Sequence, residues 1–291
     1  RMNEVQHLLN LQDKMQVAKD PIEKLRILHE AEFIPGFTSL MFVGKFLDDD
    51  RLKKPAALIA ARLALSDQTL RGRAVREVVE KALPLISGTD SAVLAKALSI
   101  KAKSIPYDFG FESMFNGKDL TGWKGLVGNP IARSKMTPEE LLNAEADANG
   151  KAKNDWVVDN GLLIFTGHGD NLCTVKKYGD FEMYVDWKIT EKGDAGIYLR
   201  GSPQVQIWDT SRREVGAQVG SGGLYNNKTN ESKPSVVADN PIKQWNNFHI
   251  MMKGDRVTVF LNGIKVTDNV VLENYWDRNI PIFVKEQIEL Q

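Results

Sequence analysis

The residues best suited to chemistry lie in one short segment, Phe181 to Ile189, where apolar and polar side chains alternate. Side chains of a β-strand point alternately to its two faces, so the apolar residues are expected to line a core and the polar ones the opposite face. The polar positions are Glu182, Tyr184, Asp186 and Lys188. Two carboxylates, a phenol and an amine in one row can exchange protons and stabilise developing charge. The simpler alternative is a solvated sheet face.

Two further segments alternate in the same way and are expected to pair beside the first. They place two sets of side chains opposite their apolar residues, namely Tyr198 and Arg200 in one segment, and Gln204, Gln206 and Trp208 in the other. Three adjacent strands would then form one concave patch of carboxylates, amides, an arginine and aromatic rings. Such a patch suits a sugar, whose hydroxyls need polar partners and whose C–H surface packs on aromatic rings. His168 lies in a glycine-rich loop that could reach this patch, although a lone loop histidine is more often solvated.

These segments belong to a region, residues 107–291, that reads as short strands separated by turn dipeptides such as Asn160-Gly161 and Asn262-Gly263. Turn residues at hairpin spacing predict antiparallel sheets, and many short strands without crossover helices predict a sandwich or jelly roll. One helical insertion is expected near residues 137–153. The expected strands are Trp156–Val158, Leu162–Thr166, Leu172–Lys176, Phe181–Ile189, Gly196–Arg200, Val205–Trp208, Asn247–Lys253, Arg256–Leu261 and Lys265–Val271.

Residues 1–106 follow a helical period instead. Asp20 and Pro21 supply a cap and a first helical residue, and Ile22, Leu25 and Leu28 then share one face. The pattern predicts five or six short helices in antiparallel hairpins, with the features of an α-solenoid fragment. No motif in this half carries chemistry, so we interpret it as a packing domain or a surface for a protein partner. The whole chain is predicted to be mainly β.

Composition excludes several classes of function. The 291 residues carry a formal net charge of zero, which gives no broad field for binding nucleic acid. No apolar run reaches the roughly 18 residues that span a bilayer. The single cysteine, Cys173, allows no intrachain disulfide and is expected to fill a small space in the core. The first residues show no apolar signal-peptide core. Composition alone therefore does not decide the cellular compartment.

A set of ordered motifs from about residue 109 onward resembles the DUF1080 family, also called the 3-keto-disaccharide hydrolase domain family. The motifs are Phe115–Trp123, Gly179–Glu182, Asp194–Gly201, Gln204–Asp209, Gly222–Tyr225 and Val259–Gly263. The resemblance implies a concanavalin A-like β-sandwich, and it adds Asp209 and Tyr225 to the residues expected to bind substrate. It also implies export by bacteria such as Bacteroidetes, and therefore a periplasmic or secreted protein.

The resemblance further implies activity on glycosides whose C3 hydroxyl has been oxidised to a ketone. Such a ketone acidifies the C2 proton, so a base can remove it, the C1 substituent can leave, and water can add back. Our hypothesis assigns the base to Glu182 or Asp186 and the stabilisation of the enolate to Lys188 and Arg200. Tyr198 or the second carboxylate would be the acid. No cofactor is predicted, and a divalent metal stays an alternative to the cationic groups.

The chain departs from the family pattern at two places. Ala195 stands where family members commonly have serine. The family also continues past the equivalent of Gln287–Gln291 with a His-Gly turn and a closing strand, so we expect a missing strand and an open sheet edge here. Two alternatives to the enzyme are a non-catalytic carbohydrate-binding module that uses the same face, and a structural protein that recruits partners through its helices. Glu182 together with Asp186 favours the enzyme, because binding alone seldom needs two close carboxylates.

Overall fold

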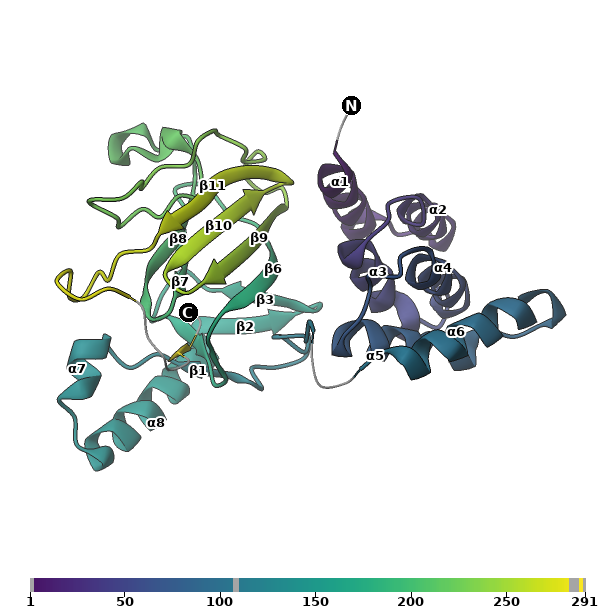
Figure 1. Ribbon diagram of the computed structural model, residues 1–291, viewed down its shortest axis with the longest axis horizontal. Coiled ribbons are helices and arrows are strands. Elements are labelled where there is room, and N and C mark those ends of the chain that lie inside the picture. Colours follow the sequence, from purple (N-terminus) through teal and green to yellow (C-terminus); the bar gives the residue numbers. More distant parts are fainter. Residues whose placement is uncertain (1–2, 107–109, 283–287, 290–291) are drawn as a thin grey trace. The chain divides into compact units, whose positions relative to one another are not determined.

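A computed structural model describes residues 3–106, 110–282 and 288–289 of the chain (Figure 1). The chain divides into two compact units, Arg1–Ser113 and Met114–Gln291. The expected domain boundary at residues 106 and 107 lies beside 107–109, which are outside the described residues. The segment after them belongs to the first unit, because the backbone N–H of Ala74 donates to the carbonyl of Phe111 (2.8 Å) and the Phe111 ring packs on Phe37 at 4.5 Å.

The first unit is helical, as the periodicity predicts. The Asp20 side chain accepts a hydrogen bond from the N–H of Ile22 (3.1 Å) and so caps the second helix before Pro21. The α-solenoid arrangement stays a prediction. The helices are α1 (Glu4–Val17), α2 (Pro21–Ala31), α3 (Phe37–Gly44), η1 (Lys45–Asp48), α4 (Lys53–Ser66), α5 (Arg73–Ala82), η2 (Leu83–Leu85), η3 (Thr89–Ser91) and α6 (Ala92–Ser104).

Helix α4 lies at the centre of the helical unit. Small side chains at Ala56, Ala57, Ala60 and Ala61 are almost fully buried and let neighbouring helices approach closely. Its apolar residues join those of the other helices in one hydrophobic cluster, which also includes the fully buried Leu28. No helix in the described part of the chain is long and apolar enough to cross a membrane.

The second unit contains the nine predicted strands, each close to its predicted position, and three short strands that were not predicted, at Trp123–Gly125, Lys177–Tyr178 and Ile288–Glu289. Its helical insertion begins with a reciprocal capping box between Thr137 and Glu140. The elements are β1 (Trp123–Gly125), α7 (Pro130–Ser134), α8 (Pro138–Asp155), β2 (Trp156–Asp159), β3 (Leu162–Phe165), β4 (Leu172–Thr174), β5 (Lys177–Tyr178), β6 (Phe181–Trp187), β7 (Asp194–Leu199), β8 (Ser202–Trp208), η4 (Arg213–Val215), η5 (Ala217–Val219), β9 (Asn246–Lys253), β10 (Arg256–Leu261), β11 (Ile264–Val271) and β12 (Ile288–Glu289).

All the strand pairs within the described residues are antiparallel, as predicted. The largest sheet has the order β11-β10-β9-β6, and the pairs β7-β8, β2-β3, β1-β4 and β12-β5 form smaller sheets. The prediction that the chain is mainly β is wrong, since helix accounts for 39% and strand for 22%. The reason is that the helical unit and the 18-residue α8 outweigh short strands joined by loops.

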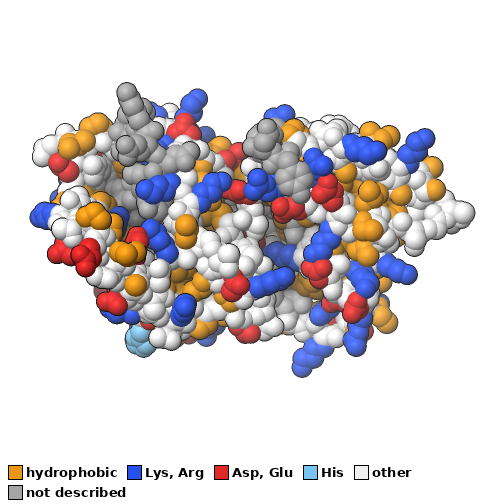
Figure 2. Space-filling view, turned by 90° about the horizontal axis from the view of Figure 1, so that it is seen from below, with side chains coloured by type: hydrophobic (Ala, Val, Ile, Leu, Met, Phe, Trp, Pro, Cys, Tyr) orange, Lys and Arg blue, Asp and Glu red, His pale blue; other side chains and the backbone are white. Residues whose placement is uncertain are grey.

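One hydrophobic cluster joins the four-stranded sheet to the β7-β8 pair. Buried residues from β6, β9, β10 and β11 meet residues from β7 and β8 there, among them Phe248, Val259, Leu199 and Val205. Because side chains alternate along a strand, the remaining residues of each sheet point away from this cluster. The closed concanavalin A-like sandwich stays a prediction. Outside, basic, acidic and apolar side chains are interspersed over the face seen in Figure 2, in line with the zero net charge.

Candidate functional site

The patch expected from the sequence divides between two surfaces. Strand β6 pairs with β9, while β7 pairs with β8, so the expected adjacency of β6 to β7 and β8 is wrong. The alternation within each strand was predicted correctly, but the partner of β6 comes from much later in the chain. Both sheets turn their apolar residues to the shared cluster, so their polar faces point in opposite directions. We call them the β6–β9 surface (Glu182, Tyr184, Asp186, Asn247, His249 and Phe260) and the β7–β8 surface (Asp194, Gly196, Tyr198, Gln204, Gln206 and Trp208).

The β6–β9 surface is a ladder of side chains that contact one another. His249 Nε2 lies 2.7 Å from Glu182 Oε1. Its ring stacks on Tyr184, with centroids 4.2 Å apart and planes 12° apart, and on Phe260 at 5.5 Å. Burial, and then the neighbouring Glu182 charge, raise the pKa of Tyr184. Rings that stack across strands about 4.8 Å apart must stand upright on the sheet. They therefore present edges to solvent, which suits a sugar poorly.

The other residues nominated on this surface also have partners. Asp186 Oδ1 accepts a hydrogen bond from the Asn247 side chain (2.7 Å), and Lys188 Nζ lies 4.6 Å from the centre of the Trp245 ring. Cross-strand pairs of this kind stabilise a sheet. The arrangement accounts for the alternation of polar residues in β6 without a reaction there.

The β7–β8 surface extends over a third segment. Gln206 donates its backbone N–H to Gly223 O (3.0 Å) and accepts from Gly222 N (2.8 Å), and Val205 bridges Leu224. Leu224 is buried in the cluster, so alternation places Tyr225 on the polar side. Within the pair, Asp194 lies opposite Trp208 at one end and Leu199 opposite Ser202 at the hairpin end.

A chain of hydrogen bonds runs across this surface to a carboxylate. The Gln204 amide donates to Gln206 Oε1, and the buried Gln206 amide donates to Asp194 Oδ1 (2.8 Å). A Cβ atom at Gly196 would lie 2.5 Å from Gln204 Oε1, so only glycine leaves room for this arrangement. The Asp194 side chain remains 49% exposed, with Arg212 Nη1 at 3.6 Å from its other oxygen. The surface therefore offers an oriented carboxylate that a ligand can reach.

Tyr198 supplies a neutral phenol on the same surface. Burial raises the pKa of Tyr198, a hydrogen bond from the Asn171 side chain partly opposes this rise, and the neighbouring Tyr275 adds to it. A phenol with a raised pKa keeps its proton at neutral pH and can donate a hydrogen bond. Trp208 is buried, and its ring meets Tyr225 edge-on at 5.2 Å. Tyr225 is 48% exposed.

Three nominated residues have other contacts. Arg200 is buried and pairs with Asp180 (2.7 Å), whose carboxylate also accepts from Gly254 N (2.7 Å). Asp209 is buried and caps a turn: hydrogen bonds from Ser211 lower its pKa against the effect of burial. His168 is exposed, and its carbonyl accepts a 3.4 Å hydrogen bond from a threonine in its own loop.

Sequence reasoning overlooked three polar residues near the β7–β8 surface. Asp194 was not nominated as a site residue, although its spacing from Gly196 and Tyr198 places it on their side of the strand. Asn171 and Asp239 come from loops, and no local pattern could have placed them. Burial raises the pKa of Asp239, whose carboxylate accepts from Ser221 N (3.0 Å).

The serine-to-alanine departure falls on the other side of β7. Ala195 pairs with Ile207, a residue of the hydrophobic cluster, and alternates with Gly196. Its side chain therefore points away from the polar surface, and the missing hydroxyl removes no group from it. The second departure involves Gln287–Gln291, of which only residues 288–289 are described. They form β12, which pairs with β5.

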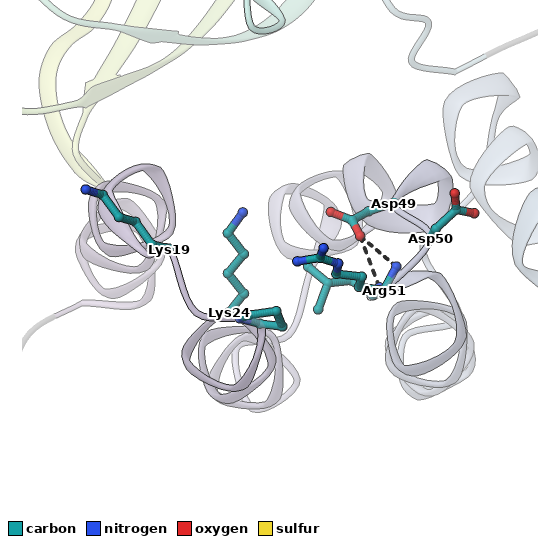
Figure 3. Close-up of a pocket in the computed structure, with 7 residues that line it drawn as sticks. Lys19, Lys24, Asp49, Asp50 and Arg51 are labelled. Carbon is teal, nitrogen blue, oxygen red and sulfur yellow. Dashed lines mark hydrogen bonds between the residues drawn. The ribbon is translucent and has the colours of Figure 1, made fainter.

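A separate cavity of about 340 Å³ lies in the helical unit, between the start of α2 and the turn before α4 (Figure 3). Lys19, Lys24 and Arg51 are among its lining residues. Asp49 accepts hydrogen bonds from the backbone N–H groups of Arg51 and Leu52, as the dashed lines show. Its carboxylate thus fixes the turn, and the cavity presents cations without an oriented acid or base. Among the described residues, no three His, Cys, Asp or Glu side chains gather in a way that could hold a metal.

Comparisons with known proteins agree with the motifs. Residues 110–291 match the model of the 3-keto-alpha-glucoside-1,2-lyase-like domain, and the chain belongs to this family. The resemblance seen in the sequence is confirmed. A 3-keto-disaccharide hydrolase of Bacteroides thetaiotaomicron is 30% identical over 105 residues, which are 35% of this chain and 32% of that protein. The match thus spans about a third of the relative's length.

Two crystal structures of candidate glycosyl hydrolases from Parabacteroides distasonis are also similar. The first is 22% identical to this chain, with a TM-score of 0.41. The match covers 62% of this chain and 86% of the chain in that structure. The second is 18% identical, with a TM-score of 0.39. The match covers 58% of this chain and 89% of the chain in that structure.

Proposed function

We propose that the second unit binds a glycoside along the β7–β8 surface and cleaves 3-keto-glycosides there. The observation that carries the proposal is the hydrogen-bonded chain from Gln204 through Gln206 to the accessible Asp194 carboxylate, on the same side as the Tyr198 phenol. These residues lie in two of the family's motifs. Four residue steps along a strand separate the Cα atoms of Asp194 and Tyr198 by about 13 Å, so the proposal requires the carboxylate and the longer phenol to lean toward each other and reach the C1–C2 bond from its two sides.

In this proposal Asp194 is the base that removes the C2 proton of the keto sugar. The electron pair forms an enolate with the C3 ketone and then expels the C1 oxygen, leaving a C1=C2 double bond. Tyr198 donates a proton to the departing oxygen, and water then adds across the double bond, with hydroxyl at C1 and hydrogen at C2. The family description, a 1,2-lyase, supports elimination across these carbons, and the relative's name supports a keto sugar as substrate.

The proposal also includes a concanavalin A-like sandwich and a periplasmic or secreted location, both supported by family membership. No metal or cofactor enters the scheme. The helical unit takes no part in the reaction, and we assign it to contacts with a protein partner. Binding without turnover would instead support a carbohydrate-binding module.

The test is to incubate the purified chain with a 3-keto-glucoside and with its unoxidised parent, and to follow release of the aglycone by chromatography. We expect release from the keto sugar only. Asp194→Asn keeps the shape of the side chain and removes the base, so kcat/KM should fall at least about 100-fold.

Glu182→Gln is the matched control, because it makes the same carboxylate-to-amide change on the β6–β9 surface. Its kcat/KM should stay within about twofold of the unmodified chain. Loss of activity in Glu182→Gln with full activity in Asp194→Asn would move the reaction to the β6–β9 surface and overturn the proposal.

A further inference from the structure

We infer that the hairpin end of the β7–β8 surface is a subsite for a flat aromatic aglycone. Two tyrosines, Tyr198 and Tyr275, lie at this end of the strand pair, and a third, Tyr225, lies across β8; we call the three the tyrosine cluster. Tyr198 lies next to Leu199, which pairs with Ser202 at the hairpin. Tyr275 donates its backbone N–H to the hydroxyl of the same Ser202 (3.0 Å). Tyr225 follows the residue that bridges Val205 of β8, and its ring turns toward Trp208, farther from the hairpin. The inference rests on the proposed function, since it assigns the second half of the same site.

Contacts of Arg278 and Trp276 hold Tyr275 in place. Arg278 lies over the Tyr275 ring at 5.6 Å, donates to the carbonyl of Asn226 (2.9 Å) and pairs with Glu273 (2.7 Å). It thereby ties Tyr275 to the segment that follows Tyr225. The Trp276 ring meets Tyr275 edge-on at 4.8 Å, and its indole N–H donates to the carbonyl of the hairpin turn. Aromatic side chains fixed in this way lose little freedom when a ligand binds.

Two rings of the cluster remain open despite these supports. Tyr225 is 48% and Tyr275 is 41% exposed. Aromatic side chains bury large areas and favour stacking or edge-on contacts with other rings. The half-exposed Tyr275 ring, fixed beside Tyr198 at the hairpin end of a polar surface, is therefore suited to hold a second ring.

Polar side chains at this end are already engaged. The Gln204 amide donates to Gln206, and the Asn227 amide donates to two backbone carbonyls. A sugar in the aglycone position needs directional partners for several hydroxyls, whereas an aromatic ring needs chiefly area. At the opposite end, Asp194 and Arg212 provide charged groups for the keto sugar. The surface is therefore polarised from a sugar end to an aromatic end.

The experiment compares two substrates with leaving groups of the same kind, 3-keto 2-phenylethyl glucoside and 3-keto ethyl glucoside. Both release an aliphatic alcohol of similar leaving-group ability. A difference in kcat/KM therefore measures the contribution of the phenyl ring to binding and not a difference in leaving-group chemistry. The unmodified chain should favour the phenylethyl substrate by about threefold to tenfold. Tyr275→Ala should abolish the preference, and Tyr275→Phe, which keeps the ring, should retain it.

Phe165→Ala is the matched control. Phe165 is 43% exposed and packs on Trp156 at 4.9 Å, much as Tyr275 packs on Trp276, but it belongs to the β2-β3 pair. This variant should keep the preference. An unmodified chain without a preference, or a Tyr275→Ala variant that keeps it, would overturn the inference.

Binding of the unoxidised 2-phenylethyl and ethyl glucosides, measured by titration calorimetry, separates this inference from the proposed function. In one outcome, keto-glycosides remain uncleaved while the phenylethyl glucoside binds more tightly than the ethyl glucoside, and only when Tyr275 is present. That result would support the aromatic subsite and contradict the proposed reaction. If keto-glycosides are cleaved without any preference for the phenylethyl substrate, the result would support the reaction and contradict the subsite. Absence of binding by both glucosides, together with absence of turnover, overturns both.

Discussion

Glu273 is the residue that holds the loop behind the tyrosine cluster. Its carboxylate accepts hydrogen bonds from the backbone N–H groups of Lys228 (2.9 Å), Thr229 (2.7 Å) and Asn230 (2.7 Å), and it pairs with Arg278. Burial alone would raise the pKa of Glu273, but the backbone donors outweigh it and lower the pKa to about 2. The ionised carboxylate therefore stabilises the fold.

Glu273→Gln should lower the free energy of unfolding at pH 7 by about 1–3 kcal/mol, because an amide cannot accept all these bonds. The folded pKa, about 2, lies below the ordinary value of 4.5, so the contribution is present above pH 4.5 and is lost as the pH falls toward 2. The difference between the two proteins in urea unfolding should thus shrink over that interval. Glu231→Gln, an exposed position in the same loop, should unfold like the unmodified chain. A difference that persists unchanged at pH 2 would contradict this account.

The chain of side-chain hydrogen bonds across β7 and β8 depends on one small residue opposite a buried amide. Gly196 lies across from Gln206, and the Gln204 side chain occupies the space beside it. Gly196→Ala would push the Gln204 amide away and break the chain of hydrogen bonds that orients Asp194. We expect kcat/KM on a 3-keto-glucoside to fall about tenfold or more, with the strand pair still formed.

Gly150→Ala provides the control for this change. Gly150 lies in α8, and a Cβ atom there would meet nothing within 4 Å. Alanine favours a helix by up to about 1 kcal/mol over glycine, so this variant should be as stable as the unmodified chain or more so, with unchanged activity. Full activity in Gly196→Ala would show that the position of the Gln204 amide does not matter for the reaction.

At the level of elements, local patterns predicted more than long-range pairings. Alternation correctly placed Met183 and Trp187 in the core, and the capping residues Asp20 and Thr137 correctly marked helix starts. The partner of β6 could not be predicted, because hydrogen bonding between strands depends on backbone groups that every sequence carries. The residues predicted to form one site therefore lie on two surfaces in the structure. Tyr198 and Gln206 share the β7–β8 surface, and Glu182 lies on the opposite β6–β9 surface.

At the scale of the whole molecule, the described residues form two separate hydrophobic cores. The helical unit has one cluster and the strand-rich unit has another, and the fully buried isoleucines Ile59 and Ile250 belong to the first and the second. Each core buries its apolar residues among elements of its own unit. Two cores of this kind are expected to unfold in two steps, so a single free energy of unfolding does not describe the chain.

The matched variants Ile59→Val and Ile250→Val test this independence, because each removes one methylene from one core. Each should destabilise its own unit by about 0.5–1.5 kcal/mol, which corresponds to a fall of roughly 2–6 °C in one transition. Differential scanning calorimetry of the full chain should show Ile59→Val lowering one transition and Ile250→Val the other. Binding of an unoxidised glucoside should raise only the transition that Ile250→Val lowers, since ligands stabilise the unit they bind. If both variants lowered one shared transition equally, the two cores would form a single cooperative unit, and the helical unit would contribute to the stability of the site.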